Sequence, residues 1–175
     1  MSARERLEAV RADITTLALD AIVNAANEPL MRGGGVDGAI RRKAGEEMET
    51  ELRRIGRCST GSAVITRGAR LPAKFVIHTV APVFAQGGAT LERKRDLLRG
   101  CYANVLTRAD EHAIASIAFP CIGTGIYGWP SDLAAEIALD AVTTHLAHCD
   151  AQTRIVFCCF ADVDRARYAA LIAAL

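Results

Sequence analysis

The sequence predicts one α/β domain of three layers, α/β/α, with a central, mainly parallel sheet. Short apolar segments alternate with helical patterns along the chain, and this alternation is typical of that architecture. Several of the apolar segments are nearly continuous, as expected of strands covered on both faces. The length of 175 residues suits one domain and leaves little room for two. No repeat or linker-like tract divides the chain, so residues 1–175 are expected to fold as one unit.

The elements follow one another in a regular order. The expected strands are Leu7–Ala12, Ala21–Ala25, Ser62–Thr66, Phe75–Val80, Ser116–Cys121 and Arg154–Phe160. The expected helices are Val36–Leu52, Glu92–Ala109, Ser131–His148 and Asp162–Ala173. Ser131 follows Pro130 and is a candidate N-cap of its helix. Because ligands of such sheets bind beyond the carboxyl ends of the strands, we expect the site in the loops after Ala25, Cys121 and Phe160.

The composition excludes several classes of protein. A chain that is 51% hydrophobic and 23% charged is not a disordered polymer. Its 21 Lys and Arg against 20 Asp and Glu argue against nucleic-acid binding by bulk charge, although they do not exclude a local basic patch. We find no secretory signal and no apolar run of about 18 residues to cross a membrane. The six cysteines form no C-x-x-C pair, which indicates reduced, mostly buried thiols in a cytoplasmic protein.

The segment Ile22–Ile40 contains the first candidate site. It ends a strand with Asn24 and Asn27 and then opens a helix after the glycine run Gly33–Gly35. Glycines let a ligand approach the backbone, and a helix start presents unpaired N–H groups that suit a phosphate. The two asparagines have amides for sugar hydroxyls, or they only shape a turn. Asp37, taken alone, is better explained by its favourable place at a helix start than by a role in catalysis.

The segment Phe119–Ser131 contains a second loop of the same kind. Its glycines at 123, 125 and 128 fit G-x-G-x-x-G, with Asp150 at about the expected distance of twenty residues. We reject a dinucleotide fingerprint here because Asp150 follows a helix, Pro130 interrupts the helix entry and only one strand remains downstream. A P-loop is excluded because no Gly-Lys-Ser/Thr follows. Two phosphate-binding loops in one α/β domain point to a diphosphate or nucleotide-sugar ligand.

Three single residues have two interpretations each. Asp13, after the first strand, could accept a hydrogen bond from an adenine amino group or shape an Asx turn. Phe160, at the end of the last strand, could stack on a ring, but a place in the core is the default. His78 lies within an apolar run, which favours a hydrogen-bonded core histidine over a ligand.

The sequence offers no clear nucleophile or metal site. His145 and His148 lie three residues apart with Cys149 adjacent, but no other clustered ligands accompany them, so a solvated helix end is favoured. There is no G-x-S-x-G elbow and no evident Cys–His pair. If the protein is an enzyme, water is the expected attacking group.

Taken together, the motifs resemble those of the macrodomain family. The matching segments are Asp13-Ile14-Thr15, Val23-Asn24-Ala25-Ala26-Asn27, the run from Gly33 to Ile40 and the run from Gly123 to Pro130. Their order and spacing are similar to those of the MacroD-type branch, which includes bacterial O-acetyl-ADP-ribose deacetylases. The resemblance extends from about Leu7 to Leu175. It implies a three-layer macrodomain with a mixed, mainly parallel sheet that binds ADP-ribose in a cleft above the sheet.

The resemblance also implies a role for each site residue. Adenine would lie near Asp13, Ile14 and Phe160, the diphosphate near Gly123, Thr124, Gly125, Ile126 and Tyr127, and the distal ribose near Asn24, Asn27, Gly33, Gly34, Gly35, Val36 and Asp37. Asn24 and Asn27 would hold ribose hydroxyls while Asp37 activates a water. The implied activity is hydrolysis of acyl or protein-linked esters, with O-acetyl-ADP-ribose and mono-ADP-ribosylated proteins as substrates and no cofactor or metal. The alternative is a reader module that binds ADP-ribose without hydrolysis.

The sequence departs from the family pattern at three positions. Arg32 stands where the branch usually has glycine, and it could add charge to the phosphate region or crowd the ribose loop. Arg41 stands where histidine is usual, one helical turn from Asp37, so the two could form an ion pair. Ala12 replaces a glycine, which is a smaller change. We expect these departures to affect rate more than binding.

Overall fold

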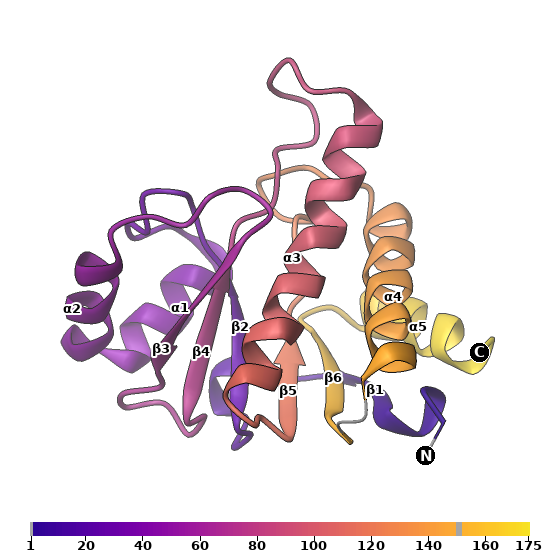
Figure 1. Ribbon diagram of the computed structural model, residues 1–175, viewed down its shortest axis with the longest axis horizontal. Coiled ribbons are helices and arrows are strands. Elements are labelled where there is room, and N and C mark those ends of the chain that lie inside the picture. Colours follow the sequence, from indigo (N-terminus) through magenta and orange to yellow (C-terminus); the bar gives the residue numbers. More distant parts are fainter. Residues whose placement is uncertain (1, 150–151) are drawn as a thin grey trace.

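The computed structural model describes residues 2–149 and 152–175, which form a six-stranded sheet with helices on both faces (Figure 1). The strands are β1 (Leu7–Arg11), β2 (Ala21–Ala25), β3 (Ala63–Arg67), β4 (Phe75–Thr79), β5 (Ser116–Phe119) and β6 (Arg154–Cys159). Their order in the sheet is β1-β6-β5-β2-β4-β3. Only the β3–β4 pair is antiparallel within these residues, which confirms the mixed, mainly parallel sheet.

Two helical layers cover the sheet. The helices are α1 (Gly35–Ala44), α2 (Glu46–Ile55), α3 (Leu91–Glu111), α4 (Ser131–His148) and α5 (Asp162–Ala173), with short 3-10 turns at Arg4–Arg6 and Ile14–Thr16. Apolar residues of α3, α4 and α5 form one core cluster with the sheet. Residues of α1 and α2 form a second cluster on the opposite face (Figure 1). None of the helices among the described residues is long and apolar enough to cross a membrane.

Gly45 divides the helix that the sequence predicts over Val36–Leu52. Its φ of 86° lies in the left-handed region, which glycine adopts without strain, and its N–H closes α1 by donating to the Arg41 carbonyl at 3.0 Å. The chain therefore turns at Gly45 and begins α2 at once. As a result, Glu49 of α2 faces back toward Arg41 of α1.

Two further expectations are wrong in detail. Ser131 is the first residue of α4 rather than its N-cap, because Pro130 occupies the cap position without a side-chain hydrogen bond. Phe160 follows β6 with 92% of its surface exposed, so it is not a core residue. Several other element ends shift by one or two residues, as is usual where helices and strands fray. Asp150 lies outside the described residues.

The parallel arrangement brings four loops together. Strands β1, β6, β5 and β2 are neighbours and run in the same direction, so their carboxyl ends lie at one edge of the sheet. The segments that follow these four ends include both glycine loops predicted to bind phosphate. A ligand site at this edge is the arrangement expected of an open parallel sheet.

Candidate functional site

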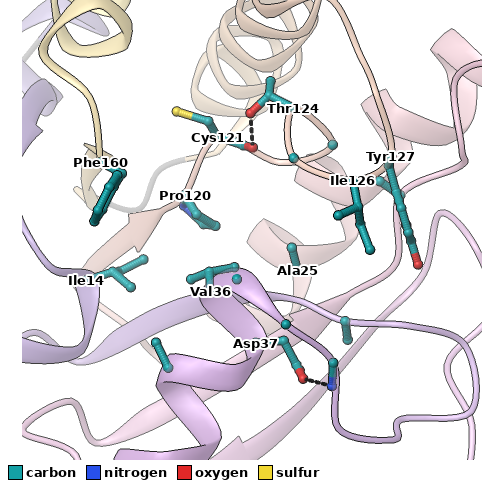
Figure 2. Close-up of a pocket in the computed structure, with 18 of the residues that line it drawn as sticks. Ile14, Ala25, Val36, Asp37, Pro120, Cys121, Thr124, Ile126, Tyr127 and Phe160 are labelled. Carbon is teal, nitrogen blue, oxygen red and sulfur yellow. Dashed lines mark hydrogen bonds between the residues drawn. The ribbon is translucent and has the colours of Figure 1, made fainter.

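A cleft of about 710 Å³ opens at the carboxyl edge of the sheet, a size suited to a nucleotide-sized ligand. It is lined by Ala12, Asp13, Ile14, Ala25, Ala26, Asn27, Gly33, Gly34, Gly35, Val36, Asp37, Ala39, Arg42, Ala81, Pro120, Cys121, Gly123, Thr124, Gly125, Ile126, Tyr127, Cys158, Phe160 and Asp164. In Figure 2, Ile14 and Phe160 border one end of the cleft and Ile126 and Tyr127 the other, with Val36 between them. The loops after β1, β2, β5 and β6 all contribute.

The structure brings every predicted site residue to this cleft except Asn24. Sequence reasoning missed several lining residues. Pro120 and Cys121 adjoin the second glycine loop, and Cys158 lies two residues before Phe160, where the two-residue period of a strand places it on the same face. These positions could have been found from their neighbours. Arg42 of α1 had no comparable signal, because its place depends on how that helix packs.

The Asp37 carboxylate is the most firmly held polar group of the cleft. The residue is 3% exposed. Its Oδ1 accepts hydrogen bonds from Asn24 Nδ2 at 2.7 Å and from Arg41 Nε at 3.0 Å, and its Oδ2 accepts one from the Gly33 N–H at 2.7 Å. A carboxylate has about four acceptor positions, so three donors leave little more than one for a water or a ribose hydroxyl. The carboxylate also ties the glycine loop to the start of α1 (Figure 2).

Asn24 lies behind Asp37 rather than in the cleft. It is fully buried, and its Nδ2 also lies 3.0 Å from His78 Nδ1. Burial lowers the pKa of His78 to about 3, with a smaller contribution from Arg41, so the ring is neutral at ordinary pH. Nδ1 then accepts from Asn24, and Nε2–H donates to Thr66 Oγ1 at 2.9 Å. The interpretation of His78 as a hydrogen-bonded core residue is confirmed, and Asn24 acts on the cleft through Asp37.

Both glycine loops present backbone amides to the cleft. Within the described residues, the N–H groups of Gly34, Gly35 and Val36 donate no hydrogen bond. The same is true of Gly125 and Ile126 in the second loop. Consecutive amides without partners form a concave site for an anion, and the start of α1 adds its positive dipole end. The geometry therefore suits a diphosphate held between two loops.

The second loop is shaped by Gly123 and Trp129. Gly123 has φ 84°, and a Cβ there would lie 2.8 Å from Trp129 Cδ1. Trp129 N–H donates to the Gly123 carbonyl at 3.0 Å, and its indole Nε1–H donates to the Pro82 carbonyl at 2.8 Å. Glycine is therefore required at 123 for both conformation and space. The loop is preformed, with Ile126 94% exposed at its tip.

Comparison with known proteins identifies the family. The model of the Macro domain family matches residues 23–138, a span that includes both glycine loops. The chain belongs to this family. The macrodomain is 54% identical to the Macro domain-containing protein RSc0334 of Ralstonia nicotianae, over 93% of this chain and 91% of that one.

Two further relatives bear on the ligand. The macrodomain is 50% identical to the ADP-ribose glycohydrolase MACROD2 of Xenopus laevis, over 91% of this chain but only 38% of that longer protein. Among solved structures, the Trypanosoma brucei macrodomain in complex with ADP-ribose matches with a TM-score of 0.87 and 38% identity. That match covers 95% of this chain and 69% of the other.

Asp13 and Asn27 of the macrodomain both line the cleft. Both also shape a turn, which was the alternative to ligand binding for each residue. Asp13 Oδ1 accepts from the Thr15 side chain at 2.6 Å and from its backbone N–H at 3.0 Å, and these bonds lower the pKa of Asp13. Its second oxygen, Oδ2, is more exposed and lies 3.8 Å from Lys43 Nζ. Asn27 closes a turn by bonding both the N–H and the carbonyl of Met31, each at 2.9 Å. Turn formation therefore does not exclude ligand contact at either residue.

The thiols that line the cleft are not activated. Burial raises the pKa of Cys158 to about 11. A hydrogen bond with Cys159, together with burial, raises the pKa of Cys121. A thiol is a weak nucleophile when protonated. Water therefore remains the expected attacking group.

A cluster of groups that could bind a metal lies at the C-terminal ends of α3 and α4, and it is larger than the sequence indicates. Asp110 of α3 joins His145 and Cys149, which corrects the expectation that no other ligand type accompanies them. Asp110 Oδ2 lies 3.0 Å from His145 Nε2, and Asp110 Oδ1 lies 3.6 Å from Cys149 Sγ. Asp110 therefore contacts both other groups, at the edge of the sheet opposite the cleft, so the cluster takes no part in the site.

Proposed function

We propose that this macrodomain binds ADP-ribose in the cleft and hydrolyses ester-linked groups from its distal ribose. One observation carries the proposal: two loops present unpartnered backbone amides to one cleft, and a buried carboxylate closes one end of it. The name of the Xenopus laevis relative, an ADP-ribose glycohydrolase, and the Trypanosoma brucei complex with ADP-ribose support the choice of ligand and reaction.

The lining residues favour one direction for the ligand in the cleft. Ile14 and the exposed ring of Phe160 offer apolar surface for adenine, and the outer oxygen of Asp13 can accept from its amino group. The diphosphate would lie between the amides of the two loops. The distal ribose would then lie beside Asp37 and Tyr127.

Two substrate classes fit this end of the cleft. In O-acetyl-ADP-ribose, water attacks the acetyl carbonyl and releases acetate and ADP-ribose. In ADP-ribosylated glutamate or aspartate, water cleaves the bond between the distal ribose and the side-chain carboxylate, so mono-ADP-ribosylated proteins would be partners. Asp37 would orient the water through its remaining acceptor position and take up its proton, a contribution of about 10²–10⁴-fold. Oxygens of the bound diphosphate can hold the same water.

A second candidate function is a reader that binds ADP-ribose without cleaving it. The arrangement around Asp37 favours this alternative, because three donors, including the Arg41 guanidinium, already occupy the carboxylate. A carboxylate that already accepts three hydrogen bonds has little room left to orient a water. The phosphate-binding loops serve a reader and an enzyme equally well.

One assay separates the two functions. Stoichiometric protein is incubated with O-acetyl-ADP-ribose, and free ADP-ribose is followed over time beside a protein-free control. We expect conversion that increases with protein and that Asp37→Asn reduces. Intact ester with saturable binding would select the reader. Calorimetry that detects no binding of ADP-ribose would contradict both functions.

A further inference from the structure

Four charged side chains form a continuous chain that ends at Asp37. Arg41 donates from Nε to Asp37 Oδ1 at 3.0 Å and from Nη1 to Glu49 Oε2 at 2.9 Å. The other oxygen of Glu49 accepts from Arg32 Nε at 2.9 Å. The order is therefore Arg32–Glu49–Arg41–Asp37, running from the surface into the cleft. Both cations of this chain, Arg32 and Arg41, are among the three positions at which the sequence is expected to depart from the family pattern.

Arg41 is buried to an unusual degree for a cation. It is 1% exposed, and its third nitrogen, Nη2, donates to the Leu30 carbonyl at 2.9 Å. A buried guanidinium is tolerated only when it is paired and hydrogen-bonded, and here each of its three nitrogens has a partner. The planar fork of arginine can satisfy three acceptors in fixed directions, whereas the single ammonium of lysine cannot reproduce that geometry.

The same side chain controls the loop that leads to the glycines. Leu30 has φ 54°, a conformation that a non-glycine residue keeps only when its surroundings hold it. Arg41 binds its carbonyl, Asn27 binds both backbone groups of Met31, and Asp37 binds the Gly33 N–H. Three side chains thus fix the loop between residues 30 and 33. Arg41 bonds to one of the other two, Asp37, so its position sets both the loop and the carboxylate.

Glu49 keeps Arg41 in place. It belongs to α2 and reaches α1 only because Gly45 turns the chain between the two helices. Its carboxylate is nearly buried and supplies a second negative charge for the guanidinium. Arg32, which is largely exposed, covers the outer oxygen of Glu49. Without Glu49, Nη1 of Arg41 would lose this partner, and Asp37 and the Leu30 carbonyl alone would hold the guanidinium.

We propose that Arg41 and Glu49 are positioning residues for hydrolysis: Glu49 orients Arg41, and Arg41 fixes the Asp37 carboxylate and the loop at Leu30 in the geometry that receives the distal ribose. Neither residue lines the cleft. This inference rests on the proposed function.

The test compares Arg41→Lys and Glu49→Gln with matched controls. Arg54→Lys and Glu47→Gln make the same changes at exposed positions of α2. The single-turnover rate on saturating O-acetyl-ADP-ribose and the Kd for ADP-ribose are measured well below each melting temperature. We expect the rate to fall about 10- to 100-fold in the two test variants, because small misplacements of a reacting group are that costly. The Kd should change little, and both controls should match the wild type.

Two results would overturn this inference and leave the proposed function intact. One is a wild-type rate in both test variants, which would leave the charged chain with a purely structural role. The other is a rise in Kd as large as the fall in rate, which would place the two residues in binding. If the wild type itself shows no turnover, the proposed function fails and the inference fails with it.

A further variant keeps the test decisive if a single substitution prevents folding. The double variant Arg41→Gln/Glu49→Gln removes both charges of the pair, and the Asp37 carboxylate keeps its hydrogen bonds from Asn24 and the Gly33 N–H. Because the two residues act as one unit, its rate should fall no further than that of the single variants. A wild-type rate in the double variant would also overturn the inference.

Discussion

Asn24 Nδ2 lies 2.7 Å from Asp37 Oδ1 and joins the carboxylate of the cleft to the centre of the sheet. Asn24 is the fourth residue of β2, and in the β2–β4 register it faces His78, whose ring it also contacts. The position of Asp37 is therefore set by a strand pairing as well as by its own helix. A group held from two elements loses little entropy when a ligand arrives, which is the condition for a preorganised site.

The first prediction concerns Asp37 itself. Asp37→Ala should lower turnover of O-acetyl-ADP-ribose by about 10²–10⁴-fold, the usual contribution of a positioned base. The affinity for ADP-ribose should fall far less, because the diphosphate is held by backbone amides. Steady-state kinetics and calorimetry on the same preparation measure the two quantities. Asp37→Asn, which keeps the shape of the side chain, should reproduce the loss of turnover, and the exposed Asp140→Asn should not. Equal losses of rate and affinity would contradict the assignment.

The second prediction concerns the pH dependence of stability. His78 has a folded-state pKa of about 3 against an ordinary value of 6.5. Between these values the unfolded chain binds a proton that the folded protein does not. The contribution of His78 to the free energy of unfolding is therefore fully present above pH 6.5 and is lost as the pH falls toward 3. In that range the free energy of unfolding falls by about 1.4 kcal/mol per pH unit. Denaturant unfolding at a series of pH values between 6.5 and 5 measures this slope before most carboxylates titrate.

The control for this prediction is His78→Gln, which cannot take up a proton. The ring of His78 faces Asn24, Thr66, Arg41 and Asp37, and the last two carry opposite charges. In the variant, about one proton fewer is taken up on unfolding between pH 6.5 and 5. The free energy of unfolding should therefore depend less steeply on pH than in the wild type. An unchanged slope would mean that another group is responsible for the acid sensitivity.

The elements with clear boundaries could be predicted from the sequence to the residue. β2, α4 and α5 have the expected ends. Asp20 precedes β2 and Pro130 precedes α4, so a polar residue and a helix breaker mark where these two elements begin. The break at Gly45 could not be predicted, because a glycine in a helical pattern does not reveal a positive φ. The ion pair of Arg41 with Asp37 followed from helical spacing, but Glu49 joins it only through that break.

The candidate site shows the same limit. The two glycine loops were found because buried strands and helix starts have recognisable sequence signals. The position of Asn24 behind Asp37 could not be predicted, because spacing alone does not tell which face of the sheet α1 covers. Alternation along β2 points Asn24 and Ile22 to one face, and Ile22 belongs to the core cluster of α1 and α2. Asn24 therefore meets Asp37 from beneath the helix instead of facing the ligand.

The third prediction uses two glycines of the second loop as a matched pair. A Cβ at Gly125 would meet nothing within 4 Å, so Gly125→Ala should leave the melting temperature unchanged. It should still weaken ADP-ribose binding by about tenfold or more, ~1.4 kcal/mol, because the methyl group would occupy the space of the phosphates. Gly123→Ala should lower both stability and affinity, since its φ of 84° and the Trp129 ring leave no room. Unchanged affinity in Gly125→Ala would contradict the phosphate site.

The last prediction concerns the adenosine end of the cleft. Phe160 exposes 92% of its surface, so Phe160→Ala should not alter the melting temperature. If its ring stacks on adenine, worth ~0.5–1.5 kcal/mol, the Kd for ADP-ribose should rise by about 2- to 12-fold. Phe160→Tyr keeps the ring and should bind as the wild type does. Val163→Ala removes exposed apolar surface nearby on α5, outside the cleft, and should have no effect. Because Asp37 lies at the other end of the cleft, the turnover of bound substrate should be the same in the wild type and in the three variants. A loss of turnover without a loss of affinity in Phe160→Ala would show that Phe160 acts on the reaction and not on adenine.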